Sequence, residues 1–284
     1  MTLRSIRPGQ LARQRALDSR RHDLERIQAA LEAAGSLLRR FYSAGVTAEF
    51  KSQGHPVTVA DRAANQLLWE MLPQHGEGWL SEESADDPGR LDKERVWVVD
   101  PLDGTSEFIA GVPEWSVSIG LVENGQAVAG GICNPATGEM ILGSAETGIM
   151  RSADETAAFS RTKDQTPWVL ASRSEVKRGE WNCYEEAPFF IRPVGSVAYK
   201  LALVAAGFAE ATWTFVPKNE WDVTAGVALV LASGGVVTTL DGQAPVFNRP
   251  DPLLQGLIAI SAKGKSLHGD LLDQWVLQGR KANA

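Results

Sequence analysis

The sequence predicts a mixed α/β protein built from two unlike halves, and two patterns indicate this. Residues 115–144 contain three short strand-like runs, the first two joined by Asn124-Gly125, a favoured sequence for a tight hairpin turn. From Trp168 to Gln278, short apolar runs instead alternate with helical patterns, as in an α/β unit with crossover connections. We therefore expect an α+β domain of residues 1–160 and an α/β domain of residues 161–284, with the polar stretch 151–167 at their boundary.

The first half opens with a predicted helix over residues 18–43. Its apolar residues recur in steps of three and four and form one stripe, made of Leu24, Ile27, Leu31, Ala34, Leu38 and Phe41. Residues 1 to about 10 lack this periodicity, so we expect a frayed end or an accessory arm there. A second helix is expected after Thr58, a natural N-cap residue, with Asp61 in a first turn where the helix dipole favours an acid.

A predicted buried strand, Val96–Val99, is followed at once by two acids. Asp100-Pro101 ends regular strand pairing, and Asp103 and Gly104-Thr105 follow, with a short helical turn expected around Phe108. Carboxylates held at the end of a buried strand repel each other unless a cation neutralises them, and Mg²⁺ is a hard cation that prefers oxygen ligands. The alternative is an ordinary surface turn, because Asp, Pro and Gly are common turn residues.

The second half predicts four strands and three helices in alternation. The expected strands are 168–171, 210–215, 236–240 and 257–261. The expected helices are 195–206, 222–233 and 267–278, and Gly207 and Gly234-Gly235 are expected to end the first two. No internal repeat is visible, so the two halves are expected to be different structures.

Composition narrows the class of function. With 28 basic and 35 acidic residues the net charge is −7, which argues against a nucleic-acid polymer as partner but not against a small phosphorylated metabolite. The longest nearly apolar run, Leu201–Ala209, is too short to span a membrane, and the N-terminus has no apolar segment typical of a secretory signal. Two widely spaced cysteines indicate no disulfide framework. We expect a cytoplasmic protein, and a homodimer is compatible with the sequence.

Two further acidic segments accompany the pair at Asp100 and Asp103. Ser81-Glu82-Glu83-Ser84 lies upstream after an apolar run, and Trp221-Asp222-Val223-Thr224-Ala225-Gly226 heads an apolar helical pattern. The three segments, (E)E…DPLDGT…WDxxAG, resemble the signature of the inositol monophosphatase superfamily over about Leu24 to Leu277. The resemblance implies a layered αβαβα sandwich with the site between its halves, and a Mg²⁺-dependent, lithium-sensitive phosphomonoesterase.

The resemblance also implies a ligand set for two or three Mg²⁺ ions. It assigns metal binding to four side chains and one main-chain carbonyl, namely Glu82, Asp100, Asp103, Asp222 and the carbonyl of Leu102. Carboxylates brought from three chain segments suit a hard divalent cation. Glu83 is a weaker candidate than Glu82, since adjacent residues on an extended segment point to opposite sides.

The remaining implied roles concern water and phosphate. Thr105, supported by Asp61, would orient or deprotonate the attacking water, with Glu82 nearby, in a direct in-line attack without a phosphoenzyme. Gly104 and Thr105 would bind the phosphate through main-chain N–H groups at a helix start, and Asp222 and Lys218 would contact the substrate. For Asp61, the residues alone favour a purely structural first-turn acid, whereas the segment PVTxAD matches the superfamily's catalytic support.

The segments that bear on the substrate resemble two different branches of the superfamily. Residues 126–135 and 248–254 look like inositol monophosphatases, whereas Ser106-Glu107-Phe108 and Lys218-Asn219-Glu220 are similar to the 3′(2′),5′-bisphosphate nucleotidase branch. The segment 212–215, Thr-Trp-Thr-Phe, lacks the acid that in the inositol branch binds ring hydroxyls. Its Trp213 and Phe215 are either core residues or a wall against a base, and Lys218 would hold a second phosphate. We therefore favour 3′-phosphoadenosine 5′-phosphate, with inositol 1-phosphate or a related sugar or polyol phosphate as the alternative.

Other classes of function find less support. The four histidines are isolated, so a zinc site is not indicated, and no GxSxG motif of a serine hydrolase is present. Gly256…Gly264-Lys265-Ser266 has the wrong glycine spacing for a phosphate-binding P-loop. A catalytically inactive, metal-binding regulatory relative is a further alternative, but Thr105 and Asp61 are both retained, which favours an enzyme.

Overall fold

The computed structural model of the chain describes residues 8–45, 49–50, 56–152 and 166–282. The elements of the first half are α1 (Pro8–Ala44), β1 (Glu49–Phe50), β2 (Pro56–Val57), α2 (Val59–Met71), β3 (Gly78–Ser81), a 3₁₀ helix (Pro88–Asp92), β4 (Arg95–Asp103), α3 (Thr105–Ile109), β5 (Ser116–Glu123), β6 (Gln126–Asn134), β7 (Glu139–Ser144) and β8 (Gly148–Arg151).

The second half continues the numbering. Its elements are β9 (Trp168–Ser172), α4 (Arg173–Lys177), a 3₁₀ helix (Asn182–Tyr184), β10 (Phe190–Val194), α5 (Val197–Ala205), β11 (Ala211–Thr214), β12 (Lys218–Asn219), α6 (Glu220–Ala232), β13 (Val236–Thr238), β14 (Leu253–Leu254), β15 (Leu257–Ile260) and α7 (Ala262–Ala282).

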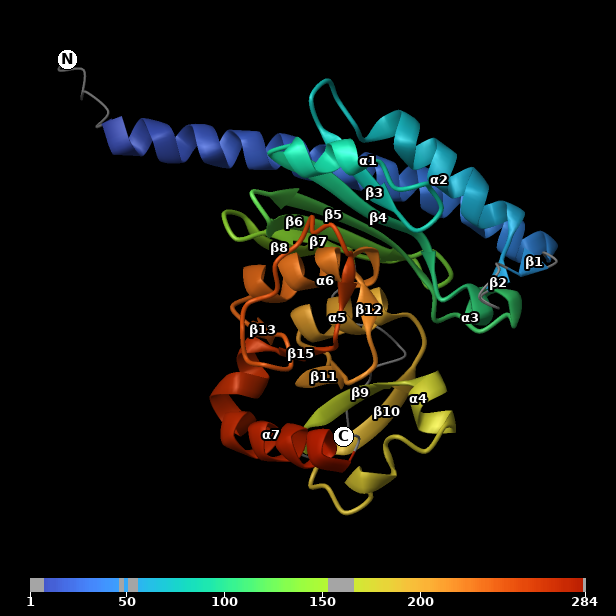
Figure 1. The fold of residues 1–284 in the computed structure, drawn as a ribbon, viewed down its shortest axis with the longest axis vertical. Coiled ribbons are helices and arrows are strands. Elements are labelled where there is room, and N and C mark those ends of the chain that lie inside the picture. Colours follow the sequence, from blue (N-terminus) through green and yellow to red (C-terminus); the bar gives the residue numbers. More distant parts are fainter. Residues whose placement is uncertain (1–7, 46–48, 51–55, 153–165, 283–284) are drawn as a thin grey trace.

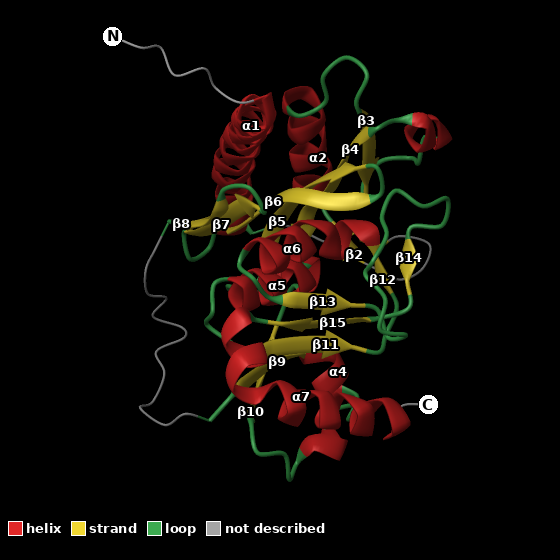
Figure 2. Ribbon diagram, turned by 90° about the vertical axis from the view of Figure 1, so that its left-hand side faces the viewer, coloured by secondary structure: helices red, strands yellow, loops and turns green. Residues whose placement is uncertain are grey.

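These elements form five layers, as the resemblance implied. Helices α1 and α2 cover one face of a six-stranded sheet of order β3-β4-β5-β6-β7-β8, and α5 and α6 cover its other face (Figures 1 and 2). A five-stranded sheet, β10-β9-β11-β15-β13, lies beneath α5 and α6, and α7 packs on its far side (Figure 2). The fold is therefore an αβαβα sandwich, and this prediction is confirmed.

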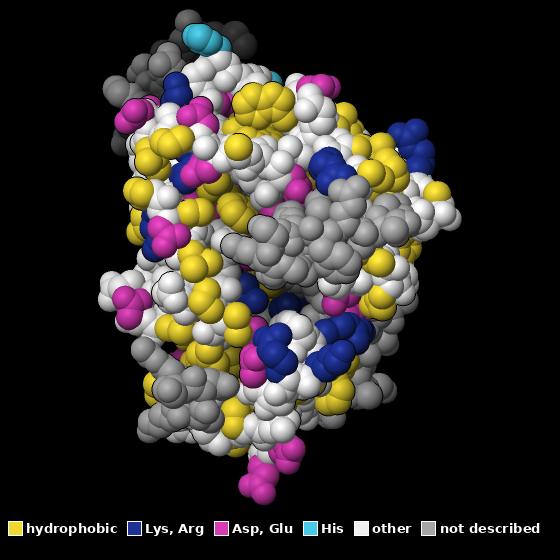
Figure 3. Space-filling view, turned by 45° about the vertical axis from the view of Figure 1, so that its right-hand side comes forward, with side chains coloured by type: hydrophobic (Ala, Val, Ile, Leu, Met, Phe, Trp, Pro, Cys, Tyr) yellow, Lys and Arg dark blue, Asp and Glu magenta, His cyan; other side chains and the backbone are white. Residues whose placement is uncertain are grey.

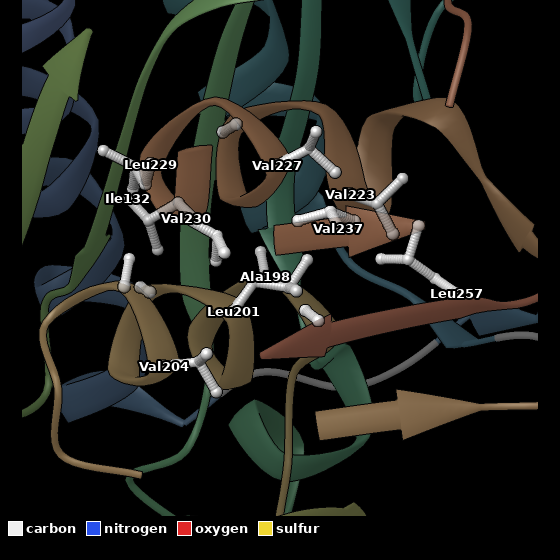
Figure 4. Close-up of a cluster of buried hydrophobic side chains, with 14 of the residues drawn as sticks. Ile132, Ala198, Leu201, Val204, Val223, Val227, Leu229, Val230, Val237 and Leu257 are labelled. Atoms are coloured by element: carbon white, nitrogen blue, oxygen red, sulfur yellow. The ribbon is translucent and has the colours of Figure 1, made fainter. Parts of the chain in front are cut away.

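Each interface between layers has its own apolar core. The stripe of α1, with Leu24, Ile27 and Leu31 almost fully buried, packs on the six-stranded sheet. In the central cluster, Leu201 of α5 and Val230 of α6 lie among side chains of both sheets (Figure 4). Because one buried cluster contains residues of both sequence halves, α5 and α6 connect the two sheets into one packed body. The division at residue 160 stays a prediction, since 153–165 lie outside the described residues.

Several elements differ from the sequence-based expectation. Helix α1 begins at Pro8 rather than near residue 18, with proline at a first-turn position where its missing N–H is harmless. Residues 88–92 form a 3₁₀ helix that was not predicted, and α7 is longer than the predicted helix 267–278. Strands β8 and β10 and helix α4 were not predicted, because each is too short or too polar to show a period.

The acidic turn is built differently from the expectation as well. Strand β4 does not end at Val99 but continues to Asp103, with an irregularity between Asp100, which faces Ser118, and Asp103, which faces Ser116. Pro101 lies inside this irregular stretch, where it has no regular ladder bond to break. The sheet therefore carries both acids outward on its own backbone, and only then does α3 begin at Thr105.

Candidate active site

Parallel pairing brings the first two acids together. Ser81 of β3 lies opposite Val99 of β4, and the main-chain N–H of Glu82 donates to the carbonyl of Val99 at 3.4 Å. Glu82, which directly follows β3, and Asp100, which lies within β4, are therefore neighbours at the same end of these two strands. Asp222 approaches from α6 on the other side, and one carboxylate oxygen from each of the three acids lies within 4.8 Å of the other two.

Burial and mutual repulsion make this cluster unfavourable as a set of bare anions. Burial is the main cause that raises the pKa of Asp100 well above its usual range, followed by the charges of Glu82, Asp103 and Asp222. For Asp222, burial and then the charges of Asp103 and Glu82 raise the pKa to about 8. A divalent cation bound among these oxygens would remove both penalties. The donor set, carboxylates plus the nearby Leu102 carbonyl, fits a hard cation.

Local hydrogen bonds fix the acids before any ion binds. Asp100 accepts the main-chain N–H of Leu102 at 2.9 Å on one carboxylate oxygen. Asp222 accepts the N–H of Asn219 at 2.9 Å and so helps to cap α6. These bonds leave each carboxylate a second oxygen for a ligand and hold its orientation.

Asp103 has a different environment from the other three predicted side-chain ligands. One of its oxygens accepts the Ser196 hydroxyl and the Ala198 N–H, both at 2.6 Å, at the start of α5. It therefore joins β4 to α5 and is not a member of the group formed by Glu82, Asp100 and Asp222. Its charge still reaches the group, since it raises the pKa of Asp100 and of Asp222.

The pair of Thr105 and Asp61 is assembled as expected. The Thr105 hydroxyl lies 3.1 Å from an oxygen of Asp61 and 3.1 Å from the Leu102 carbonyl. The second Asp61 oxygen accepts the N–H of Thr58 at 2.7 Å and its hydroxyl at 2.6 Å, which completes a capping box at the start of α2. The structural and supporting interpretations of Asp61 are thus compatible, because each uses a different oxygen. Burial is the main cause that raises the pKa of Asp61.

Gly104 needs its lack of a side chain. It has φ of +94°, and a Cβ there would lie 3.1 Å from the Glu114 carbonyl oxygen and 3.3 Å from Trp115. The chain thus turns sharply between Asp103 and Thr105, at a position that requires glycine.

Glu83 is not part of the three-acid group, although its charge contributes to the raised pKa of Asp61.

A cavity of about 650 Å³ joins these residues. Its walls include the acids, Gly104, Thr105, the predicted substrate contact Lys218 and two groups that the sequence interpretation missed, Ser172 and Lys200. A hollow between the upper and lower parts of the molecule is visible from one side, with Lys or Arg side chains inside it (Figure 3). The acids and the two lysines therefore face one space.

Lys200 is the principal residue that sequence reasoning missed. Its side chain is 5% exposed, and its ammonium donates to the Ser196 carbonyl at 3.2 Å. Burial, and then repulsion by Lys218, lowers its pKa to about 8. The available signal was a single lysine inside the otherwise apolar segment of α5.

The aromatic residues of β11 do not line the cavity with a stacking face. Trp213 is 2% exposed, stacks on Trp181 with ring centroids 5.3 Å apart and donates to the Tyr184 hydroxyl at 3.0 Å. Phe215 packs against the same cluster beneath α7. Of the two interpretations left open, the core interpretation is the one that the structure supports, and the base wall was wrong.

The comparisons with known proteins agree with this geometry. The family model described as the inositol monophosphatase family matches residues 20–277. The chain belongs to the inositol monophosphatase family. Inositol-1-monophosphatase of Mesorhizobium japonicum is 34% identical over 227 residues, which cover 76% of this chain and 84% of that protein.

Relatives of both predicted branches are found. The 3′-phosphoadenosine 5′-phosphate phosphatase of Mycobacterium bovis is 32% identical over 235 residues, covering 76% of this chain and 82% of that protein. Among solved structures, CysQ from Bacteroides thetaiotaomicron, a bacterial member of the inositol monophosphatase family, has a TM-score of 0.71 and 28% identity, covering 84% of this chain and 97% of that one. The family is thus one of phosphatases, and its members here act on different small phosphorylated molecules. No helix in the described part of the chain is long and apolar enough to cross a membrane.

Proposed function

We propose that this member of the inositol monophosphatase family is a Mg²⁺-dependent phosphomonoesterase that acts on 3′-phosphoadenosine 5′-phosphate. The observation that carries the class of reaction is the set of three acids from three segments, within 4.8 Å of one another, beside the Thr105 and Asp61 pair. Glu82, Asp100, Asp103, Asp222 and the Leu102 carbonyl would hold the ions, two or three in number. Asp103 would use the carboxylate oxygen that does not accept from Ser196 and Ala198. Mg²⁺ bound there supplies a water of lowered pKa and neutralises the phosphate.

The chain's own residues orient the reaction. Because Thr105 donates its hydroxyl hydrogen to Asp61 or to the Leu102 carbonyl, its oxygen presents a lone pair to an attacking water. Glu82 lines the same cavity as Thr105 and would lie near this water, and Gly104 and Thr105 would bind the phosphate through their main-chain N–H groups. The water oxygen attacks phosphorus in line, the bond to the leaving oxygen breaks, and free phosphate and an alcohol result.

Two lysines support the choice of a substrate with a second phosphate. Lys200 and Lys218 line the same cavity as the acids, and the charge of Lys218 helps to lower the pKa of Lys200. Burial lowers the pKa of Lys200 even though the charges of Asp103, Glu175 and Glu107 raise it, and a second phosphate would further stabilise the charged ammonium. A polyol monophosphate offers no second anion to this end of the cavity.

One observation favours inositol 1-phosphate as a second candidate. Strand β11 carries no acid, but the buried Glu175 of α4 lies against its end, where its carboxylate accepts the Thr214 hydroxyl at 2.6 Å. Its carboxylate also lies 3.8 Å from the Lys218 ammonium. An acid held there by a threonine and a lysine would bind ring hydroxyls if Lys218 moved aside.

Kinetics with both substrates test the proposal. We expect kcat/KM with Mg²⁺ to be clearly higher for 3′-phosphoadenosine 5′-phosphate than for inositol 1-phosphate, and Lys200→Met to lower only the former, by about tenfold or more. Lys265→Met, which removes an exposed lysine of α7, is the matched control. A preference for inositol 1-phosphate would overturn the proposed substrate and leave the proposed reaction class standing.

Li⁺ at about 10–50 mM and subsaturating Mg²⁺ is expected to inhibit hydrolysis of either substrate.

A further inference from the structure

A buried arginine connects the two chain segments that carry Glu82 and Asp222. Arg90 is 2% exposed and lies at the centre of a hydrogen-bonded group that we call the clasp, made of Asp86, Arg90, Asn248 and Glu220. On one side, the Arg90 guanidinium donates to both carboxylate oxygens of Asp86, at 2.6 and 3.0 Å. Asp86 lies in the loop that leaves Glu82, so this two-fold contact fixes that loop.

On its other side, Arg90 is bound to a loop 158 residues away. Its guanidinium donates to the Asn248 side-chain oxygen at 2.7 Å, and the Asn248 amide donates back to the Arg90 carbonyl at 3.1 Å. Arg90 also donates to the main-chain carbonyl of Arg249 at 3.0 Å. Asn248 has φ of +55°, an uncommon value for a residue other than glycine, and this turn directs its side chain to Arg90.

The loop is in turn bound to the start of α6. Glu220 is fully buried, and its two carboxylate oxygens accept the main-chain N–H groups of Asn248, at 2.7 Å, and Arg249, at 3.0 Å. Glu220 stands two residues before Asp222 in the first turn of the same helix. A continuous set of hydrogen bonds therefore leads from the loop after Glu82 to the helix that holds Asp222.

We propose that the clasp sets the separation of Glu82 and Asp222 and thereby the affinity for Mg²⁺, with Arg90, Asn248 and Glu220 as positioning residues. The two acids come from different layers and repel each other, so in the ion-free protein only the surrounding structure keeps their oxygens within 4.8 Å. Residues that orient metal ligands commonly change metal affinity by about 10–100-fold when removed. The inference rests on the proposed function, since it requires that Glu82 and Asp222 share an ion.

Asn248→Gly is a suitable test because glycine accepts a positive φ and keeps the N–H that binds Glu220. Only the side-chain bridge to Arg90 is lost. Asn124→Gly is the matched control, since Asn124 also has a positive φ, 49°, but lies exposed in the hairpin between β5 and β6. Asn248→Asp keeps an acceptor for Arg90 and loses the donor to the Arg90 carbonyl.

The measurement is the dissociation constant for Mg²⁺, by calorimetry on the full chain after removal of metal by chelation. We expect Asn248→Gly to bind Mg²⁺ about tenfold or more weakly, Asn248→Asp to be intermediate, and Asn124→Gly to match the wild type within about twofold. At saturating Mg²⁺ the kcat of Asn248→Gly should return to within about threefold of the wild type, which a merely structural defect would not show.

The outcomes separate the two hypotheses. If the wild type binds Mg²⁺ and Asn248→Gly binds it equally well, the clasp is overturned and the proposed function stands. If the wild type takes up no Mg²⁺, the proposed function falls and the clasp falls with it. Should Asn248→Gly fail to fold, Asn248→Asp decides the question, and a wild-type dissociation constant in that variant would overturn the clasp.

Discussion

At the scale of single residues, the site consists of carboxylates that each perform two tasks. One oxygen of Asp61 caps α2 while the other meets Thr105, and Asp222 caps α6 while it faces Asp100. One oxygen of Asp103 accepts hydrogen bonds from Ser196 and Ala198 at the start of α5. Such divided use holds each acid rigidly without an ion, which is the form of preorganisation that catalysis requires.

Replacement of Asp100 by asparagine should remove the negative charge of this side chain while keeping its size. We expect Asp100→Asn to lower kcat at saturating Mg²⁺ by about two orders of magnitude or more, because an ion ligand loses its charge. The fold should survive, since an amide oxygen can still accept the Leu102 N–H. Phosphate release with Asp270→Asn, an exposed acid of α7, provides the control. Near-normal turnover of Asp100→Asn would contradict the assigned role.

The buried Lys200 predicts a dependence of stability on pH. Its pKa is about 8 in the folded chain against 10.5 for an ordinary lysine, so between these values the unfolded chain binds more protons and folding stability rises with pH. Below about pH 8 the buried charge costs about 3 kcal/mol, and this penalty disappears towards pH 10.5. The advantage of Lys200→Met over the wild type in free energy of unfolding should therefore be largest near pH 7 and shrink above pH 8. A constant difference measured by denaturant titration would contradict it.

At the scale of elements, the position of α6 depends on glycines in the six-stranded sheet against which it packs. Gly120 of β5 and Gly130 of β6 lie opposite each other in the ladder. A Cβ on Gly120 would lie 2.6 Å from the Thr224 side chain, and one on Gly130 would lie 2.4 Å from the Ala225 carbonyl oxygen. The bare backbone at this pair lets α6 approach the sheet closely, and this approach brings Asp222 to the acids of β3 and β4.

Gly130→Ala should consequently destabilise the protein and weaken its site together. The new methyl group would meet rigid backbone, and overpacking of this kind costs about 1–3 kcal/mol. Gly269→Ala is the control, because a Cβ on Gly269 in α7 has nothing within 4 Å and should stabilise the helix by about 0.5–1 kcal/mol. Denaturant unfolding and the Mg²⁺ dissociation constant measure both effects, and an unchanged Mg²⁺ affinity in Gly130→Ala would argue against the coupling.

At the scale of the whole molecule, the layers place the site at the boundary between the six-stranded sheet and the α5–α6 layer. Glu82 follows β3 and Asp100 lies in β4 of the six-stranded sheet, whereas Asp222 lies in the first turn of α6 between the sheets. The central core that α5 and α6 share with both sheets keeps these segments in one frame (Figure 4). An ion bound by all three acids would add a direct connection across this layer boundary.

Mg²⁺ should for this reason raise the thermal stability of the whole chain. A ligand at about 100 times its dissociation constant stabilises the folded state by about 2.7 kcal/mol, which for a chain of this size is a shift of several degrees in Tm. Chelation should reverse the shift, and Asp100→Asn should show little of it. Scanning calorimetry with and without Mg²⁺ provides the measurement, and an equal response of the wild type and Asp100→Asn would contradict a shared site.

The sequence by itself determined the features that depend on near neighbours and on periodicity. The stripe of α1, the Thr58 cap, the Asn124-Gly125 hairpin and the strands flanking it were all predicted, because each is specified by residues a few positions apart. The three acidic motifs likewise indicated which residues belong to the site, and the structure brings Glu82, Asp100 and Asp222 together.

Only the tertiary structure decided how distant segments meet. In the structure, Asp103 accepts a hydrogen bond at the start of α5, and Glu175 accepts one from Thr214. Lys200 lines the cavity, and Trp213 lies in the core. Strand register and helix crossing fix these contacts, and neither is written in the spacing of nearby residues. Short, polar elements such as α4 and the 3₁₀ helix that carries Arg90 escape prediction for the same reason, since long-range packing and hydrogen bonds, not local preference, give them their shape.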